Sequence, residues 1–135
     1  MKVVIDTNVF LVCVTRTSRL HWIIQCLLDE KFTLCVTTDI LAEYAEILEQ
    51  KINVRVSEDI MAFLEKQPNI ERVNTSFRFL MIPNDPDDNK FVDCAISTGA
   101  DFIVSHDTHF NILKHIPFPK VEVIDTTEFH KRLFV

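Results

Sequence analysis

Four acidic residues in separate segments of the chain could together bind a hard metal ion. They are Asp6, Glu43, Asp88 and Asp107. Mg²⁺ and Mn²⁺ prefer oxygen ligands and keep several waters, so three or four carboxylates are enough to hold one or two such ions. Among these acids no histidine stands at the spacing of a zinc site, so the sequence disfavours zinc.

The elements that must position these acids follow from the hydrophobic pattern. Short apolar runs predict strands at 3–5, 32–36, 102–104 and 121–124, with a weaker strand near 76–81. Between them, apolar residues at i, i+3 and i+4 predict helices at 20–29, 39–51, 57–66, 87–98 and 126–133. Buried strands that alternate with helices indicate a parallel sheet covered on both faces. The 135 residues fit one domain, 1–135.

This order of elements predicts one location for the four acids. Asp6 follows the first strand, and Asp107 comes three residues after Val104, which ends another. Glu43 lies in the second turn of a helix that follows a strand, and Asp88 opens the helix over 87–98. Because the carboxyl ends of parallel strands form the ligand-binding edge of an open sheet, we expect all four at that edge.

Two of the acids also break the polarity of their helices. Asp88 falls on the apolar stripe of its helix, where an ionised carboxylate is costly unless a cation or hydrogen-bond donors compensate. Glu43 borders the apolar face of the earlier helix. The neighbouring residues expected to point to solvent are Asp87, Asn89 and Asp93 in one helix and Glu46 and Glu49 in the other.

Each acid taken alone has a simpler interpretation. Asp6 and Asp107 both precede helical patterns and could be N-caps. Glu43 could be a solvated helix residue, and Asp88 a first-turn acid favoured by the helix dipole.

Composition excludes several classes of protein. The net charge of −6 argues against a basic protein that coats nucleic acid by charge, and one glycine, Gly99, rules out Gly-rich phosphate loops. Four cysteines without a CxxC pair predict buried thiols in a reduced protein rather than a zinc site. With no signal-like or membrane-spanning run in the sequence, we expect a cytoplasmic protein without membrane association.

Several motifs in order resemble those of PIN-domain nucleases. The opening motif is at 4–10 (VIDTNVF), the second at 37–44 (TTDILAEY) and the third at 85–95 (DPDDNKFVDCA). The segment 99–107 (GADFIVSHD) and the tail at 123–129 (VIDTTEF) complete the resemblance, which spans essentially the whole chain. It is closest to the bacterial subgroup described as toxin components of toxin–antitoxin pairs.

The resemblance implies a three-layer α/β/α sandwich with a central, mostly parallel sheet. It also implies a Mg²⁺- or Mn²⁺-dependent endoribonuclease that cleaves single-stranded RNA by attack of metal-activated water, with the four acids as its catalytic and metal-binding site. Asn8 and Ser105 would orient ligands or water. A cognate antitoxin and a homodimer are further expectations, with the apolar residues Leu48, Ile52, Ile60 and Phe63 in a dimer interface or in the core.

Some residues are candidates for substrate binding, and others differ from those usual in the family. Arg16 and Arg19 could hold phosphates, although their segment could also be a polar loop that caps the next helix at Ser18. Trp22 and Phe77 could stack on bases or pack in the core. The departures are Asn89, where close relatives often carry Asp, and the histidines His106 and His109, which flank Asp107. His106 is expected at the surface, with proton transfer as the alternative role.

Three other functions stay open at the level of sequence. A phosphatase with Asp6 as nucleophile would need a second Asp two residues later, where Asn8 stands. A catalytically silent PIN-like scaffold that binds RNA or protein is the main alternative. A DNA-directed nuclease of the same fold is the third, because no residue that reads the 2′-hydroxyl can be identified.

Overall fold

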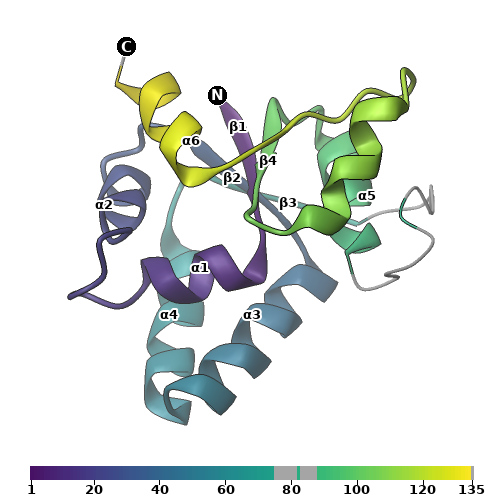
Figure 1. Cartoon of the computed structure of the whole chain (residues 1–135). Coiled ribbons are helices and arrows are strands. Elements are labelled where there is room, and N and C mark those ends of the chain that lie inside the picture. Colours follow the sequence, from purple (N-terminus) through teal and green to yellow (C-terminus); the bar gives the residue numbers. More distant parts are fainter. Residues whose placement is uncertain (75–81, 83–87, 135) are drawn as a thin grey trace.

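The computed structural model describes residues 1–74, 82 and 88–134 (Figure 1). Within these residues the strands are β1 (Lys2–Ile5), β2 (Thr33–Thr37), β3 (Ile70–Val73), β4 (Phe102–Val104) and β5 (Val123–Ile124). The helices are α1 (Thr7–Cys13), α2 (Trp22–Leu28), α3 (Thr38–Lys51), α4 (Val54–Lys66), α5 (Asn89–Thr98), the 3₁₀ helix η1 (Thr108–His115) and α6 (Thr126–Leu133).

The five described strands are all parallel, in the order β3-β2-β1-β4-β5, which confirms the predicted sheet. The central strand β1 pairs Val3 with Leu34 of β2 and Val4 with Ile103 of β4. These four side chains are completely buried, as expected for strands covered on both faces.

The outer strand β3 was not predicted. Its sequence, Ile70-Glu71-Arg72-Val73, carries two charged residues and gives a weak apolar signal, because an edge strand is only half-buried. The weaker strand predicted near 76–81, the loop with Pro83 and Pro86, and Phe77 and Asp87 all lie outside the described residues.

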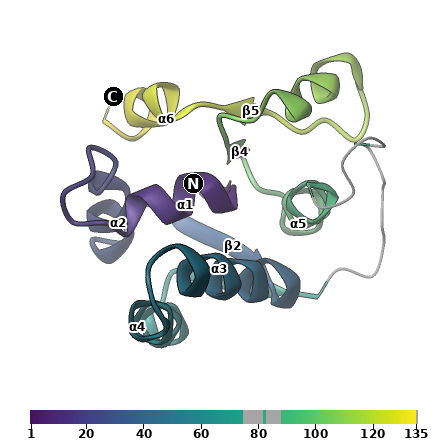
Figure 2. The ribbon, with the colours of Figure 1, turned by 60° about the horizontal axis from the view of Figure 1, so that its bottom comes forward.

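Helices cover both faces of the sheet, so the expected three layers are confirmed. Figure 2 shows α2 and α6 on one side of the strands and α5 and η1 on the other. On the first side, Phe129 of α6 packs against two other rings. Its ring centroid lies 5.3 Å from that of Phe32 and 5.7 Å from that of Phe102. On the second side, α5 contacts β1, β2, β3 and β4.

Local hydrogen bonds fix where the helices begin and end. The hydroxyl of Thr37 accepts a hydrogen bond from the backbone N–H of Ile40 at 3.1 Å, which starts α3 at the end of β2. Asp125 caps α6 in the same way, through the N–H of Glu128 at 2.8 Å. Helix α5 ends at Gly99, whose φ of 66° favours glycine.

One buried tyrosine holds α3 against the end of β1. Tyr44 donates a hydrogen bond from its hydroxyl to the carbonyl oxygen of Ile5. Its ring stacks on the ring of Phe10 in α1, with centroids 4.1 Å apart. Because Glu43 precedes Tyr44, this packing brings Glu43 to the edge of the sheet where Asp6 stands.

Several smaller expectations are also tested. The four cysteines are free and buried, as predicted, and burial raises the pKa of both Cys13 and Cys94 to about 12, so these two stay thiols at neutral pH. Of the dimer candidates, Leu48 is a core residue, whereas Ile52 is exposed. None of the described helices has the length and apolar character that a bilayer crossing requires.

Candidate active site

Asp6 and Asp107 are joined through one serine at the carboxyl ends of β1 and β4. Because Ile5 pairs with Val104, Asp6 and Ser105 come side by side after their strands. The Ser105 hydroxyl donates to Oδ2 of Asp6 at 2.9 Å and accepts the backbone N–H of Asp107, also at 2.9 Å. Ser105 therefore fixes the Asp6 carboxylate and the turn that carries Asp107.

The two aspartates differ as helix caps. Asp6 occupies the N-cap position of α1, a fully described helix, but its side chain makes no capping hydrogen bond, so the capping interpretation is wrong for this carboxylate. The Asp107 carboxylate does cap η1, accepting the N–H of His109 at 2.9 Å on Oδ1. The Asp6 carboxylate is thus held by Ser105 rather than by capping, and the Asp107 carboxylate combines a structural role with its place at the site.

The electrostatics of Asp6 favour a nearby cation. Its side chain is buried, with 5% of the residue exposed, and burial raises the pKa of this carboxyl above its ordinary value. The negative charges of Asp107 and Glu43 raise the pKa further, while the Ser105 hydrogen bond opposes the shift. Crowded carboxylates of this kind repel one another, and a bound cation would relieve the repulsion.

Asp88 and Asp107 meet at an imidazole. Nδ1 of His109 lies 3.4 Å from Oδ2 of Asp88 and 3.4 Å from Oδ1 of Asp107. One donor atom from each of the three residues lies within 4.8 Å of the other two. Asp88 is buried at the N-terminus of α5, as its place on the apolar stripe predicted, and His109 is exposed on η1.

Glu43 is held by two donors on other helices. Thr7 of α1 donates a hydrogen bond from its hydroxyl to Oε2, and Nζ of Lys90 lies 2.6 Å from Oε1. The simple picture of a solvated helix residue is therefore wrong, although Glu46 and Glu49 of the same helix are exposed as expected. Glu43 stands near Asp6 with its charge balanced by Lys90.

A cavity of about 360 Å³ lies directly beside the acids. Asp6, Asn8 and Asp107 line it together with Arg19, so the predicted arginine and asparagine reach the same cavity as two of the acids. Arg16 is exposed on the loop between α1 and α2. In that loop the Ser18 hydroxyl accepts a hydrogen bond from the N–H of Leu20 at 3.0 Å, but the N-cap of α2 is His21, so the prediction that Ser18 caps this helix is wrong.

Asn89 and Asp93 were expected to face solvent, and both are buried. Helix α5 lies against four strands and also contacts α3, so its burial extends beyond one stripe. The Asn89 amide pairs with the backbone of Ile82 in both directions, accepting its N–H and donating to its carbonyl, each at 2.9 Å. Asn89 is thus a structural residue, and an aspartate could not make the second of these bonds.

Sequence reasoning missed His109. The signal was available, because an N-cap side chain bonds to the backbone N–H two or three residues later and so lies close to those residues. A histidine two residues after a candidate ligand was therefore a candidate partner for it. The contact of His109 with Asp88 was not predictable in this way, because Asp88 belongs to a different segment.

The donor set fits a divalent cation. Carboxylate oxygens suit Mg²⁺ and Mn²⁺, and an imidazole nitrogen additionally suits transition metals. The fold places this donor set at the carboxyl edge of an open parallel sheet, which is where α/β proteins bind their ligands.

Comparison with known proteins identifies the family. The sequence matches the PIN domain family over residues 2–109, so the chain belongs to that family, whose members are generally nucleases. No curated protein matches the chain by sequence.

Solved structures share the fold at low sequence identity. VapBC2 from Rickettsia felis, bound to a DNA fragment from its promoter, has a TM-score of 0.64 and 14% identity, covering 93% of this chain and 98% of that one. VapBC-1 from nontypeable Haemophilus influenzae has a TM-score of 0.63 and 16% identity, covering 94% and 99%. The PIN domain endonuclease Utp24 has a TM-score of 0.51 and 19% identity, covering 92% and 84%.

Proposed function

We propose that this protein is a metal-dependent endoribonuclease that cleaves single-stranded RNA. One observation carries the proposal: donor atoms of Asp88, Asp107 and His109 lie within 4.8 Å of one another in a chain of the PIN domain family. Buried Asp6 stands next to this group, tied to the Asp107 turn through Ser105. An acidic site in a negatively charged chain suits a divalent cation that attracts a phosphodiester.

Asp88 and Asp107 are the residues we propose as direct ligands of Mg²⁺ or Mn²⁺, with His109 as a nitrogen ligand. Asp6 faces the same site, and Glu43 contributes directly or through water. When bound, the ion supplies a Lewis acid for the phosphate and a water of lowered pKa. The number of ions, one or two, depends on whether Asp6 and Glu43 bind the same ion as Asp88.

The other residues of the site position the ligands and the substrate. Ser105 holds Asp6 in one orientation, and Lys90 together with Thr7 holds Glu43. Arg19 supplies a positive charge to the cavity that Asp6 and Asp107 line, where it can pair with a substrate phosphate. Asn8, exposed in the same cavity, can donate a hydrogen bond to substrate or water.

We further propose that the protein is the toxin of a toxin–antitoxin pair and acts in the cytoplasm as a homodimer. Support comes from the resemblance to the toxin subgroup of the family and from the fold shared with the two VapBC proteins. Growth inhibition on expression, relieved by co-expression of a protein encoded next to it, tests the toxin role.

The nuclease proposal is tested by cleavage of end-labelled single-stranded RNA, with single-stranded DNA and structured RNA alongside. Reactions contain Mg²⁺, Mn²⁺ or EDTA. Asp6→Asn and Asp88→Asn remove site charges, and Asp59→Asn makes the same change at an exposed position on α4. We expect metal-dependent cleavage that both site variants lose and the Asp59 variant keeps.

Other outcomes point to other functions. Cleavage that survives in both site variants would show that the activity comes from elsewhere and would overturn the assignment. Cleavage of DNA in preference to RNA would favour a DNA-directed nuclease. A protein that binds RNA but neither cleaves it nor binds Mn²⁺ would support the silent scaffold.

A further inference from the structure

A second cavity continues from the acidic site toward α6. It has a volume of about 390 Å³, and Arg19, Leu20 and His106 line both this cavity and the one that contains Asp6. Each cavity lies within the size range of small-ligand sites. A ligand bound at the acids can therefore extend past this shared wall without crossing the protein interior.

The chemistry of the second cavity differs from that of the acids. Its described lining carries Arg19, Lys131 and two histidines and contains no carboxylate, in a chain of net charge −6. The two acids at the start of α6 have partners of their own: Asp125 caps the helix, and Glu128 accepts a hydrogen bond from Arg132 at 3.2 Å. This region is therefore suited to an anion.

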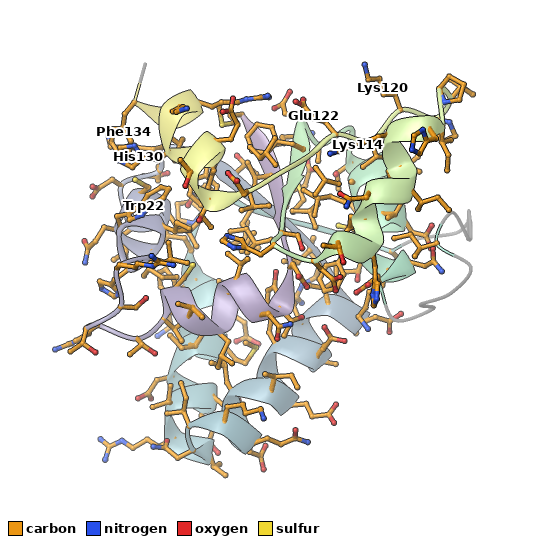
Figure 3. All side chains as sticks on the ribbon, in the orientation of Figure 1. Trp22, Lys114, Lys120, Glu122, His130 and Phe134 are labelled. Atoms are coloured by element: carbon orange, nitrogen blue, oxygen red, sulfur yellow. The ribbon has the colours of Figure 1, made fainter. Side chains whose placement is uncertain are left out.

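One wall of the cavity is aromatic. Trp22 lines it, and the His130 ring meets the Trp22 ring edge-on, with centroids 5.0 Å apart. Figure 3 shows Trp22, His130 and Phe134 together where α2 meets α6. Trp22 is half-buried against the core, so it is held in place while part of its surface stays accessible. A nucleobase can pack on such a surface without sequence preference.

The wall between the two cavities is fixed by a contact between loop and helix. The backbone N–H of Thr126 donates to Nε2 of His106 at 3.4 Å, and the Thr126 hydroxyl lies 3.0 Å from the same atom. Since Nε2 accepts, a neutral His106 carries its proton on Nδ1, which leaves an N–H donor on a residue that lines both cavities. This contact ties the Ser105–Asp107 turn to the start of α6.

We propose that this cavity is a nucleotide subsite for the residue next to the cleaved phosphodiester. Arg19, Lys131 and His106 bind its phosphate, and Trp22 with His130 contacts its base. The inference rests on the proposed nuclease function and names the path of the single strand, from the acids past His106 to α6. The expected preferred ligand is therefore a single-stranded nucleic acid longer than a dinucleotide.

The test measures binding of a labelled single-stranded RNA in an Asp88→Asn background, which prevents cleavage, over a range of salt concentrations. Lys131→Gln and Arg19→Gln each remove one cation from the subsite. Lys120→Gln and Lys114→Gln remove the same charge from a different cavity, on the opposite side of the view in Figure 3. Melting temperature shows that every variant is folded.

We expect each subsite variant to raise the Kd roughly 3- to 10-fold and to reduce the slope of log K against log salt by about 0.7, the value for one lost contact to a single strand. Both control variants keep the slope. A strand carrying 5-iodouridine beside the cleavage position should photocrosslink to the peptide that contains Trp22 or His130.

The subsite and the nuclease function can fail separately. Equal Kd values and salt slopes for Lys131→Gln and Lys120→Gln, in a protein whose wild type cleaves RNA, would overturn the subsite and leave the function standing. A wild type that neither binds nor cleaves any single strand overturns both. Crosslinking only to peptides of α3 or α4 would show that the strand takes a different path.

Discussion

The two halves of the acidic edge balance their negative charge in different ways. On the α3 side, the ammonium of Lys90 lies 2.6 Å from Glu43 and the Thr7 hydroxyl donates to the same carboxylate. On the η1 side, Asp88 and Asp107 share the exposed imidazole of His109, at 3.4 Å from each. A cation can replace a long contact to an exposed imidazole more easily than a short ion pair. We therefore expect Asp88 and Asp107 to contribute most to metal binding and Glu43 to contribute less, because Lys90 already balances its charge.

The largest effect expected from this difference concerns Asp107→Asn. Asparagine caps a helix as well as aspartate does, so the fold should persist while the site loses a charge. We expect RNA cleavage to fall about 10³-fold and the Mn²⁺ affinity to fall more than roughly 10-fold. Glu43→Gln should change the Mn²⁺ affinity less than about 3-fold, since Glu43 already has a cationic partner.

Titration calorimetry with Mn²⁺ measures both affinities, and circular dichroism confirms folding. If Glu43→Gln reduces Mn²⁺ binding as much as Asp107→Asn does, the two halves are equivalent and the comparison is wrong.

The Asn89→Asp variant tests whether a further carboxylate on α5 would add to the proposed metal ligands Asp88 and Asp107. The amide donates to the Ile82 carbonyl from a buried position, and a carboxylate there would face that oxygen with a negative charge. We expect the free energy of unfolding to fall by about 2 kcal/mol without a gain in Mn²⁺ affinity. Urea denaturation measures the loss, with Asn111→Asp at an exposed position of η1 as the matched control. A stable variant with tighter Mn²⁺ binding would place residue 89 in the site.

His109→Gln separates a nitrogen ligand from a simple neighbour of the two aspartates. Because imidazole suits Mn²⁺ better than it suits Mg²⁺, we expect the Mn²⁺ affinity to fall roughly 10-fold and the Mg²⁺ affinity to change less than about 3-fold. The control is His115→Gln, an exposed histidine at the end of the same helix. Equal losses for the two metals, or no loss for either, would remove His109 from the ligand set.

The smallest expected effect is on stability and depends on pH. The pKa of Asp6 is raised by burial, so in the pH range between its unfolded and folded pKa the native state binds more protons than the unfolded state. Stability contributed by this group is therefore lost as pH rises through that range. Asp6→Asn should melt a few degrees higher than wild type at pH 7, and the difference should shrink toward acid pH. A lower melting temperature at pH 7 would mean that the Asp6 carboxylate stabilises the fold.

Much of the architecture could be predicted from local patterns. Apolar runs located four of the five strands in the described residues, and helical periodicity located α2 to α6 within a few residues. The edge strand β3 was missed because Glu71 and Arg72 interrupt its apolar character. Burial of Asp88 was predictable, since it shares a stripe with Phe91 and Val92, whereas burial of Asp93 depended on how many neighbours surround α5.

The sequence by itself determined which acids stand at strand ends and helix starts, because parallel strands place those positions at one edge whatever the details of packing. The partner of each acid was decided by the tertiary structure. Lys90 pairs with Glu43, and His109 joins Asp88 to Asp107, since α3, α5 and η1 meet around the carboxyl ends of β1 and β4. Periodicity reports which way a side chain faces within its own element, whereas a contact between elements depends on distances that only the packed sheet and helices fix.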